Sequence, residues 1–313
     1  MDLERKPELL NQLADSLSES NPWSGLGINS DSHLIFIGMG SSHYASAIIA
    51  SRLRALGMNA VAELASNKLL PKITNLTVII AVSASGGSIE TLSAVQSLKG
   101  KARIIALTNY PESEVAKASD RIVLLQSEPE IGGVACRSFA HTIALHLALE
   151  SLLFSTTSQL VKTIRTAATA HSHVLENRSV WQPRAQEILS GGDASYFAAP
   201  AERFSSAQQS ALMMREGPRI ASVGCETADW SHVDVYLTKV QDYRLMIFAG
   251  SSWEKQLMKW CTERESKVIA VGGEVQGADF IIRYPGDEST EVALLLESYF
   301  AELIAADLWI NQK

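Results

Sequence analysis

Short apolar runs alternate with longer segments of helical periodicity along most of this chain of 313 residues. The run 76–82 is mostly β-branched, whereas 89–98 places its apolar residues at helical spacing. Alternation of this kind is typical of parallel sheets, because two parallel strands must be joined by a long crossover that is usually a helix. The pattern therefore predicts an α/β fold in which parallel sheets are flanked by helices.

The same order of elements occurs twice. Strands are expected over 33–37, 60–63, 76–82, 103–108 and 121–125, and again over 194–199, 220–223, 245–249, 267–271 and 280–284. Helices are expected over 4–17, 44–56, 89–98, 137–154, 204–214, 254–262 and 290–309, with a further helical stretch over 157–190. We interpret this order as a tandem duplication of one α/β domain, which suits the length of the chain. The predicted organisation is an N-terminal helix and linker (1–30), a first domain (31–156), a helical connection (157–190) and a second domain (191–313).

Two loops rich in serine and glycine follow strands of the first half and open helices. They are Gly38-Met39-Gly40-Ser41-Ser42 and Ser83-Ala84-Ser85-Gly86-Gly87-Ser88. In an open α/β sheet, ligands bind beyond the carboxyl ends of the strands. Glycines let backbone N–H groups turn toward an anion, and the helix N-terminus adds partial positive charge. The loops are therefore predicted to hold a phosphate; the alternative is that each is only a helix cap with a tight turn.

The sequence patterns of a dinucleotide site, a metal site and a disulfide framework match this chain less well than that of a phosphate site. Gly38 and Gly40 could open a dinucleotide fingerprint with Glu63 as the ribose-binding acid, but His43 occupies the position of the third glycine. The seven histidines are scattered, so no metal site is predicted, and no cofactor is expected. Three cysteines lie far apart without a CxxC motif, which argues against a disulfide framework.

Composition and charge argue against three further classes of protein: nucleic-acid binders, membrane proteins and secreted proteins. A net charge of −7 argues against a general nucleic-acid binder, which needs a basic surface to displace counterions. No apolar run approaches the ~20 residues of a membrane span. The charged start of the chain shows no secretory signal. The expectation is a cytoplasmic protein without nucleic-acid or membrane partners.

Both loops and a later segment resemble motifs of the sugar isomerase (SIS) domain family. Gly40-Ser41-Ser42 is similar to the family's first Gly-Ser/Thr-Ser loop, and 83–88 resembles its Ser-x-Ser-Gly-x-Ser/Thr phosphate loop. Residues 130–135 resemble the segment that closes the first domain's site. The resemblance implies two tandem SIS domains, each a three-layer α/β/α unit of flavodoxin-like type. It also implies that a sugar 6-phosphate is bound by Gly40, Ser41, Ser42, Ser83, Ala84, Ser85 and Ser88.

In the second half, Ala211-Leu212-Met213-Met214-Arg215-Glu216 resembles the family's Ala-Leu-x-x-Lys-Glu helix end. The resemblance implies that Glu216 moves a proton between C1 and C2 of the sugar. His232 follows at the family's spacing and would open the sugar ring. Proton transfer suits a partly buried carboxylate, and ring opening suits a group that titrates near neutrality. In relatives this histidine reaches the site of a partner subunit, so a homodimer with a shared active site is implied.

The chain departs from the family pattern in several places. Ala199-Pro200-Ala201-Glu202 replaces a glycine-rich loop, so the second domain is not expected to hold a phosphate, and Val233-Asp234 replaces the Gly-Pro after the histidine. Lys313 does not align with the family's C-terminal catalytic lysine. No glutaminase domain is expected. The predicted function is isomerisation or deamination of a sugar 6-phosphate, in particular of an amino sugar; the alternative is a catalytically silent module that senses a phosphosugar.

Overall fold

The computed structural model describes residues 2–311, so Lys313 lies outside the described residues. The chain divides into two compact units, each with its own sheet. The first unit comprises Asp2 and Glu8–Arg165, and the second comprises Leu3–Pro7 and the chain from Thr166 onward. The division falls inside α6 (Thr157–Glu176), within the segment predicted to connect the halves.

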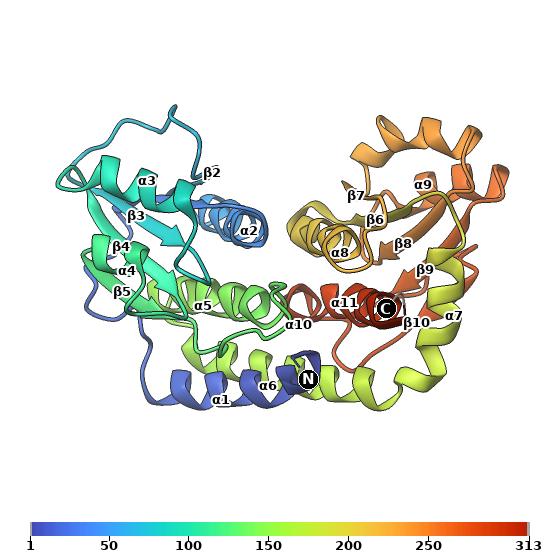
Figure 1. The fold of residues 1–313 in the computed structure, drawn as a ribbon, viewed down its shortest axis with the longest axis horizontal. Helices are drawn as coiled ribbons and strands as arrows, with labels where there is room; N and C mark the ends of the chain where they lie inside the picture. The colour runs from blue at the N-terminus through green and yellow to red at the C-terminus, as the bar shows by residue number, and fades with distance from the viewer. Residues whose placement is uncertain (1, 312–313) are drawn as a thin grey trace. The chain divides into compact units, whose positions relative to one another are not determined.

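The first unit is a five-stranded parallel sheet with the strand order β2-β1-β3-β4-β5 (Figure 1). Its strands are β1 (His33–Gly38), β2 (Asn59–Leu64), β3 (Thr77–Val82), β4 (Arg103–Thr108) and β5 (Arg121–Leu124). Its helices are α2 (Ser41–Ala55), α3 (Ile89–Leu98), α4 (Glu114–Ala118) and α5 (Arg137–Leu153), and α1 (Lys6–Glu19) begins in the second unit and ends in the first. The predicted parallel sheet flanked by helices is therefore confirmed.

Side chains of the sheet alternate between two helical layers. Ile35 and Ile79 point to one face, where they pack with Val95 of α3 and Val115 of α4. Phe36 points to the other face, where its ring meets His146 of α5 at 5.1 Å between centroids. Because both faces are covered, the central strands are apolar on both sides, and β3 is buried along its whole length. Burial lowers the pKa of His146 to about 3, so this histidine is a neutral core residue.

The second unit repeats this topology, with the strand order β7-β6-β8-β9-β10. Its strands are β6 (Ser195–Ala199), β7 (Ser222–Glu226), β8 (Arg244–Phe248), β9 (Lys267–Val271) and β10 (Phe280–Ile282). Its helices are α7 (Arg178–Ser190), α8 (Phe204–Glu216), α9 (Glu254–Glu263), α10 (Thr290–Leu296) and α11 (Ser298–Asn311). In both sheets the first strand in the chain lies between the second and the third. In the first unit β1 lies between β2 and β3, and in the second unit β6 lies between β7 and β8. The two halves are thus copies of one fold, as predicted.

Residues 3–7 belong to the second unit because they are bonded to α11. Lys6 Nζ lies 2.5 Å from Glu302 Oε2, and both side chains are buried. The Tyr299 hydroxyl donates a hydrogen bond to the Leu3 carbonyl at 2.9 Å. A buried ion pair is held strongly in place, because loss of either partner would leave an uncompensated charge.

Several elements differ from the sequence prediction at their ends, and three differ for reasons that the structure shows. The strand expected over 220–223 is β7 at 222–226, because Ile220 still bonds to Met214 in the turn after α8 and Arg219 has φ +63°. The helix expected over 290–309 is interrupted at Glu297, a buried carboxylate paired with Arg203. The short helix α4 was not predicted; Ser113 caps it by accepting a hydrogen bond from Ala116 N. Within residues 2–311, no helix combines the length and hydropathy needed to cross a membrane.

Candidate functional site

The two serine–glycine loops lie at one edge of the first unit. We call residues 38–42 loop 1 and residues 83–88 loop 2. Loop 1 begins at the end of β1 and loop 2 follows β3; the strands are parallel neighbours, with Ile37 opposite Ala81. The strand order reverses here, because β2 lies on one side of β1 and β3 on the other. A reversal of this kind is the usual place for a ligand in an open parallel sheet.

Loop 1 brings the first turn of α2 close to the strand end. A Cβ on Gly38 would lie 2.9 Å from Ser42 Cβ and 3.1 Å from the Val82 carbonyl oxygen, so this position needs glycine. Gly40, with φ +51°, is the N-cap of α2 and has no side chain with which to cap it. Ser41 and Ser42 form the first turn of α2 and are half-buried. The loop therefore brings two hydroxyl groups to a helix N-terminus, which suits an anion.

Loop 2 is a tight turn anchored to β4. Gly86, with φ +65°, donates its N–H to the Ser83 carbonyl at 2.9 Å. The Ala84 carbonyl accepts hydrogen bonds from Asn109 N at 3.1 Å and from Thr108 Oγ1 at 3.3 Å. Ser83 is buried and Ser85 is exposed. The end of β4 thus holds the turn on its buried side, and the Ser85 hydroxyl lies on its exposed side.

Ser88 has a structural task in loop 2. Its hydroxyl accepts hydrogen bonds from Thr91 N at 3.2 Å and Thr91 Oγ1 at 3.0 Å, and it donates to Glu90 Oε2 at 3.0 Å. Ser88 is therefore the N-cap of α3, which is the alternative role that the sequence left open for such a loop. Its assignment as a phosphate ligand remains a prediction.

A third segment at this edge, which includes residues 130–135, is held in place by Asn109 and Glu130. Asn109 donates to Ser127 Oγ at 2.7 Å and accepts from Ser127 N at 3.1 Å, which ties the chain after β5 to the end of β4. Glu130 caps α5, because its carboxylate accepts from the N–H groups of Cys136 and Arg137 and from the Ser138 hydroxyl. Asn109 could have been found as the first polar residue after a buried strand.

The residues of the dinucleotide alternative are engaged elsewhere. Glu63 accepts a hydrogen bond from Asn67 Nδ2 at 2.7 Å. His43 lies in the first turn of α2, where burial lowers its pKa, while a hydrogen bond with the Glu63 backbone and the Glu63 charge act in the opposite direction. Burial therefore disfavours a charged His43. The serines and backbone amides of loops 1 and 2 offer neutral donors to an anion.

The equivalent edge of the second unit is filled by the protein itself. Arg203 follows β6, is 5% exposed and donates to the Ala249 carbonyl at the end of β8. Its Nε lies 3.3 Å from Glu297 Oε1, and a Cβ on Gly250 would meet its Nη2 at 3.1 Å. Burial raises the pKa of Glu297 to about 7, against the opposing effect of Arg203. An ion pair of the chain thus occupies the edge at which the first unit carries loops 1 and 2.

Glu216 and His232 lie at opposite edges of the second sheet. Helix α8 starts beyond the carboxyl end of β6 and must return to the amino edge, because β7 is parallel to β6. Glu216, half-buried, is the last residue of α8. His232, which is exposed, follows the carboxyl end of β7. Strand β7 has five residues, which span roughly 15 Å. Within one chain the structure does not bring these two side chains together.

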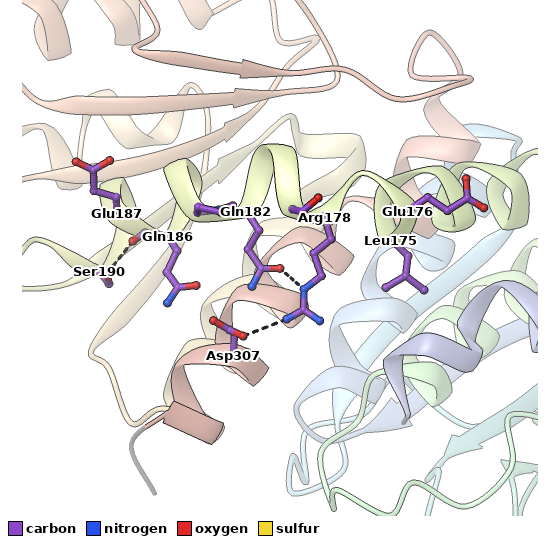
Figure 2. Close-up of a pocket in the computed structure, with 10 residues that line it drawn as sticks. Leu175, Glu176, Arg178, Gln182, Gln186, Glu187, Ser190 and Asp307 are labelled. Atoms are coloured by element: carbon purple, nitrogen blue, oxygen red, sulfur yellow. Dashed lines mark hydrogen bonds and ion pairs between the residues drawn. The ribbon is translucent and has the colours of Figure 1, made fainter.

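A groove of about 830 Å³ lies between α7 and α11 of the second unit (Figure 2). Arg178 on its wall bonds Gln182 through Nε at 2.5 Å and Asp307 through Nη2 at 3.3 Å. The predicted site residues do not line this groove. Within residues 2–311, no group of three or more His, Cys, Asp or Glu side chains is arranged to hold a metal ion.

Residues 27–157 match the family model described as SIS domain. The glutamine–fructose-6-phosphate aminotransferase (isomerizing) of Sulfurisphaera tokodaii is 32% identical over 127 residues, which is 40% of this chain and 22% of that relative. The chain therefore spans about a fifth of the length of this curated relative. The residues that the family model matches include loops 1 and 2.

Solved structures match both units. The C-terminal domain of glucosamine-fructose-6-phosphate aminotransferase from Francisella tularensis has a TM-score of 0.81 at 15% identity, covering 98% of this chain and 94% of that one. Glucosamine-6-phosphate deaminase from Thermotoga maritima has a TM-score of 0.74 at 19% identity, covering 100% and 95%. At such identities the likeness concerns the fold alone. It confirms the predicted fold of two tandem α/β units, each a parallel sheet flanked by helices.

Proposed function

We propose that this chain, whose residues 27–157 match the SIS domain model, binds a sugar 6-phosphate and isomerises or deaminates it. The observation that carries the proposal is the position of loops 1 and 2, side by side where the strand order of the first sheet reverses. The relatives named above act on, or are named for, fructose 6-phosphate and glucosamine 6-phosphate. An amino sugar 6-phosphate is therefore the proposed substrate.

The proposed chemistry divides between binding and proton transfer. The phosphate is held by serine hydroxyls and backbone amides of loops 1 and 2, which suits an acidic protein because these donors carry no net charge. Glu216 takes a proton from one carbon of the open-chain sugar and returns it to the next, so that aldose and ketose interconvert. His232 transfers the proton that opens the ring.

The opposite positions of Glu216 and His232 support a homodimer with shared active sites. One chain cannot bring the two side chains together, so a second copy would have to supply His232. Val233, Tyr236 and Val240, close to His232 in the sequence, are 54%, 63% and 80% exposed. Three exposed apolar side chains within eight residues would suit an interface with another chain.

Mixing two inactive variants tests the shared site. Glu216→Gln and His232→Asn are each expected to be nearly inactive alone. After the two are unfolded and refolded together, about a quarter of wild-type turnover should return, since half of the dimers are mixed and each has one intact site. Turnover is measured with fructose 6-phosphate and glucosamine 6-phosphate. Activity that stays at the level of the single variants would contradict a shared site.

The sensor remains the second candidate. It is favoured by the Arg203–Glu297 pair, which fills the ligand edge of the second unit, and by the capping role of Ser88. Calorimetry and a turnover assay on the same panel of sugar phosphates distinguish the two functions. An enzyme both binds and converts at least one member of the panel. Tight binding without conversion of any member would identify a sensor, and absence of binding would contradict both.

A further inference from the structure

The segment that carries His232 has little secondary structure of its own to hold it. It consists of two 3-10 helices, η3 (Asp229–Ser231) and η4 (Asp234–Lys239), between β7 and β8. Helices this short are not stable alone, because few hydrogen bonds offset the order that they require. The position of His232 must therefore come from side chains that attach η3 and η4 to the sheet.

Asp234 provides such an attachment. Its carboxylate is buried, and its Oδ2 accepts hydrogen bonds from the Cys225 thiol at 2.9 Å and from the Tyr243 hydroxyl at 3.4 Å. Tyr243 in turn accepts a hydrogen bond from Trp230 Nε1 at 2.8 Å. The network joins β7, η3, η4 and the residue before β8. His232 lies between Trp230 and Asp234 in the chain, so both sides of it are held.

The donors in this network are neutral and keep their protons. Burial raises the pKa of the Cys225 thiol, and the charge of Asp234 raises it further. The pKa of Tyr243 is raised for the same two reasons. A buried carboxylate needs hydrogen-bond donors, and loss of one leaves it incompletely satisfied. Without one of these donors, the buried Asp234 carboxylate has a lower free energy where water can reach it. Because Asp234 is part of η4, we expect η4 to shift with it.

A second anchor holds the far part of η4. Arg264 Nη1 donates to the Val235 carbonyl at 2.5 Å and to Thr238 Oγ1 at 2.7 Å. Trp230 and Val235 pack into the same core cluster as Cys225. Beside these buried contacts, His232 and Val233 are exposed. The segment thus has a fixed inner side and presents the histidine outward.

We propose that Asp234, held by Cys225 and Tyr243, is a positioning residue that fixes how His232 is presented. The inference rests on the proposed function, in which His232 opens the sugar ring.

Two substrates separate ring opening from the later proton transfer. Fructose 6-phosphate is largely a closed ring, which must open before isomerisation. 5-Deoxyfructose 6-phosphate has no 5-hydroxyl and cannot close this ring, so its conversion does not need the histidine. His232→Asn should lower kcat/KM on the order of a hundredfold for the first substrate and leave the second within about twofold. A fall in kcat/KM for fructose 6-phosphate alone is therefore the pattern expected when the histidine is lost, and the variants below are compared with it.

Cys225→Val removes one donor while keeping an apolar side chain of similar size. We expect it to lower kcat/KM for fructose 6-phosphate on the order of tenfold and to leave the open-chain substrate within about twofold. Tyr243→Phe removes the other donor and should give the same pattern. Cys225→Ser keeps a donor and should restore the rate. The matched control is Cys261→Val, a buried cysteine of the same core cluster, which should lower neither rate.

Amide hydrogen exchange gives a second readout that does not depend on turnover. The His232 and Val233 amides bond to the Asp229 carbonyl, and their exchange should be faster in Cys225→Val and Tyr243→Phe but not in Cys261→Val. If His232→Asn separates the substrates but both donor variants slow them equally or not at all, the positioning role is wrong and the proposed function stands. If His232→Asn does not separate the substrates, the ring-opening role and the positioning role are both wrong.

Discussion

Glu216→Gln is expected to lower kcat for isomerisation of a sugar 6-phosphate on the order of a thousandfold, because the amide cannot accept the proton of C1 or C2. Glutamine has the shape of glutamate, so the end of α8 at Glu216 should be preserved. The affinity for the sugar phosphate, measured by calorimetry, should stay within about twofold, since loops 1 and 2 are unchanged. Exchange of the C1 or C2 hydrogen with deuterated water, followed by NMR, should disappear together with turnover.

The control for Glu216→Gln is Glu288→Gln, which removes a carboxylate from an exposed position in the same unit. It should leave kcat, affinity and hydrogen exchange at wild-type values. If Glu216→Gln keeps more than about a tenth of wild-type turnover, Glu216 is not the base that moves the proton.

Gly86→Ala is expected to weaken the binding of a sugar phosphate on the order of a hundredfold, as measured by calorimetry. The added Cβ would lie 2.1 Å from Ser113 Oγ and 2.2 Å from Ser113 Cβ, which no real contact allows. It would also place an alanine at φ +65°. Because Ser113 caps α4, loop 2 is the part that must move, and its serines then leave the positions from which they face the ligand.

The control for Gly86→Ala is Gly100→Ala, in the turn between α3 and β4. Gly100 has φ +76°, but its added Cβ would meet no atom within 4 Å. This variant has the same kind of backbone strain without the clash, so it should lose some stability and keep its affinity for the sugar phosphate. If Gly86→Ala binds as tightly as Gly100→Ala, loop 2 does not hold the phosphate.

Much of the fold was predictable because its signals are local. The β-branched runs and helical periods placed most strands within two residues of their true ends, and the repeated order revealed the duplication. The break at Glu297 was not predictable. The carboxylate at this break pairs with Arg203, which lies far away in the chain and meets Glu297 only in the folded second unit. Periodicity in 290–309 carries no trace of that pairing.

The candidate site divides in the same way. The residue types of loops 1 and 2 were readable in the sequence, since serine and glycine between a strand and a helix either cap the helix or offer donors to an anion. The engagement of Ser88 as a helix cap, and of Asn109 as the tie between two loops, depends on which atoms meet. Single-sequence patterns do not contain that information.

By itself, the sequence determined that the protein is a duplicated α/β fold with two serine–glycine loops at strand ends, because strands, helices and tight turns are governed by near neighbours in the chain. Only the tertiary structure decided which strands adjoin, and hence that loops 1 and 2 share one edge. It alone placed Glu216 and His232 at opposite edges and joined Cys225 to Asp234. These relations depend on burial and on partners distant in the chain, which exist only once the sheets and their helices have packed together.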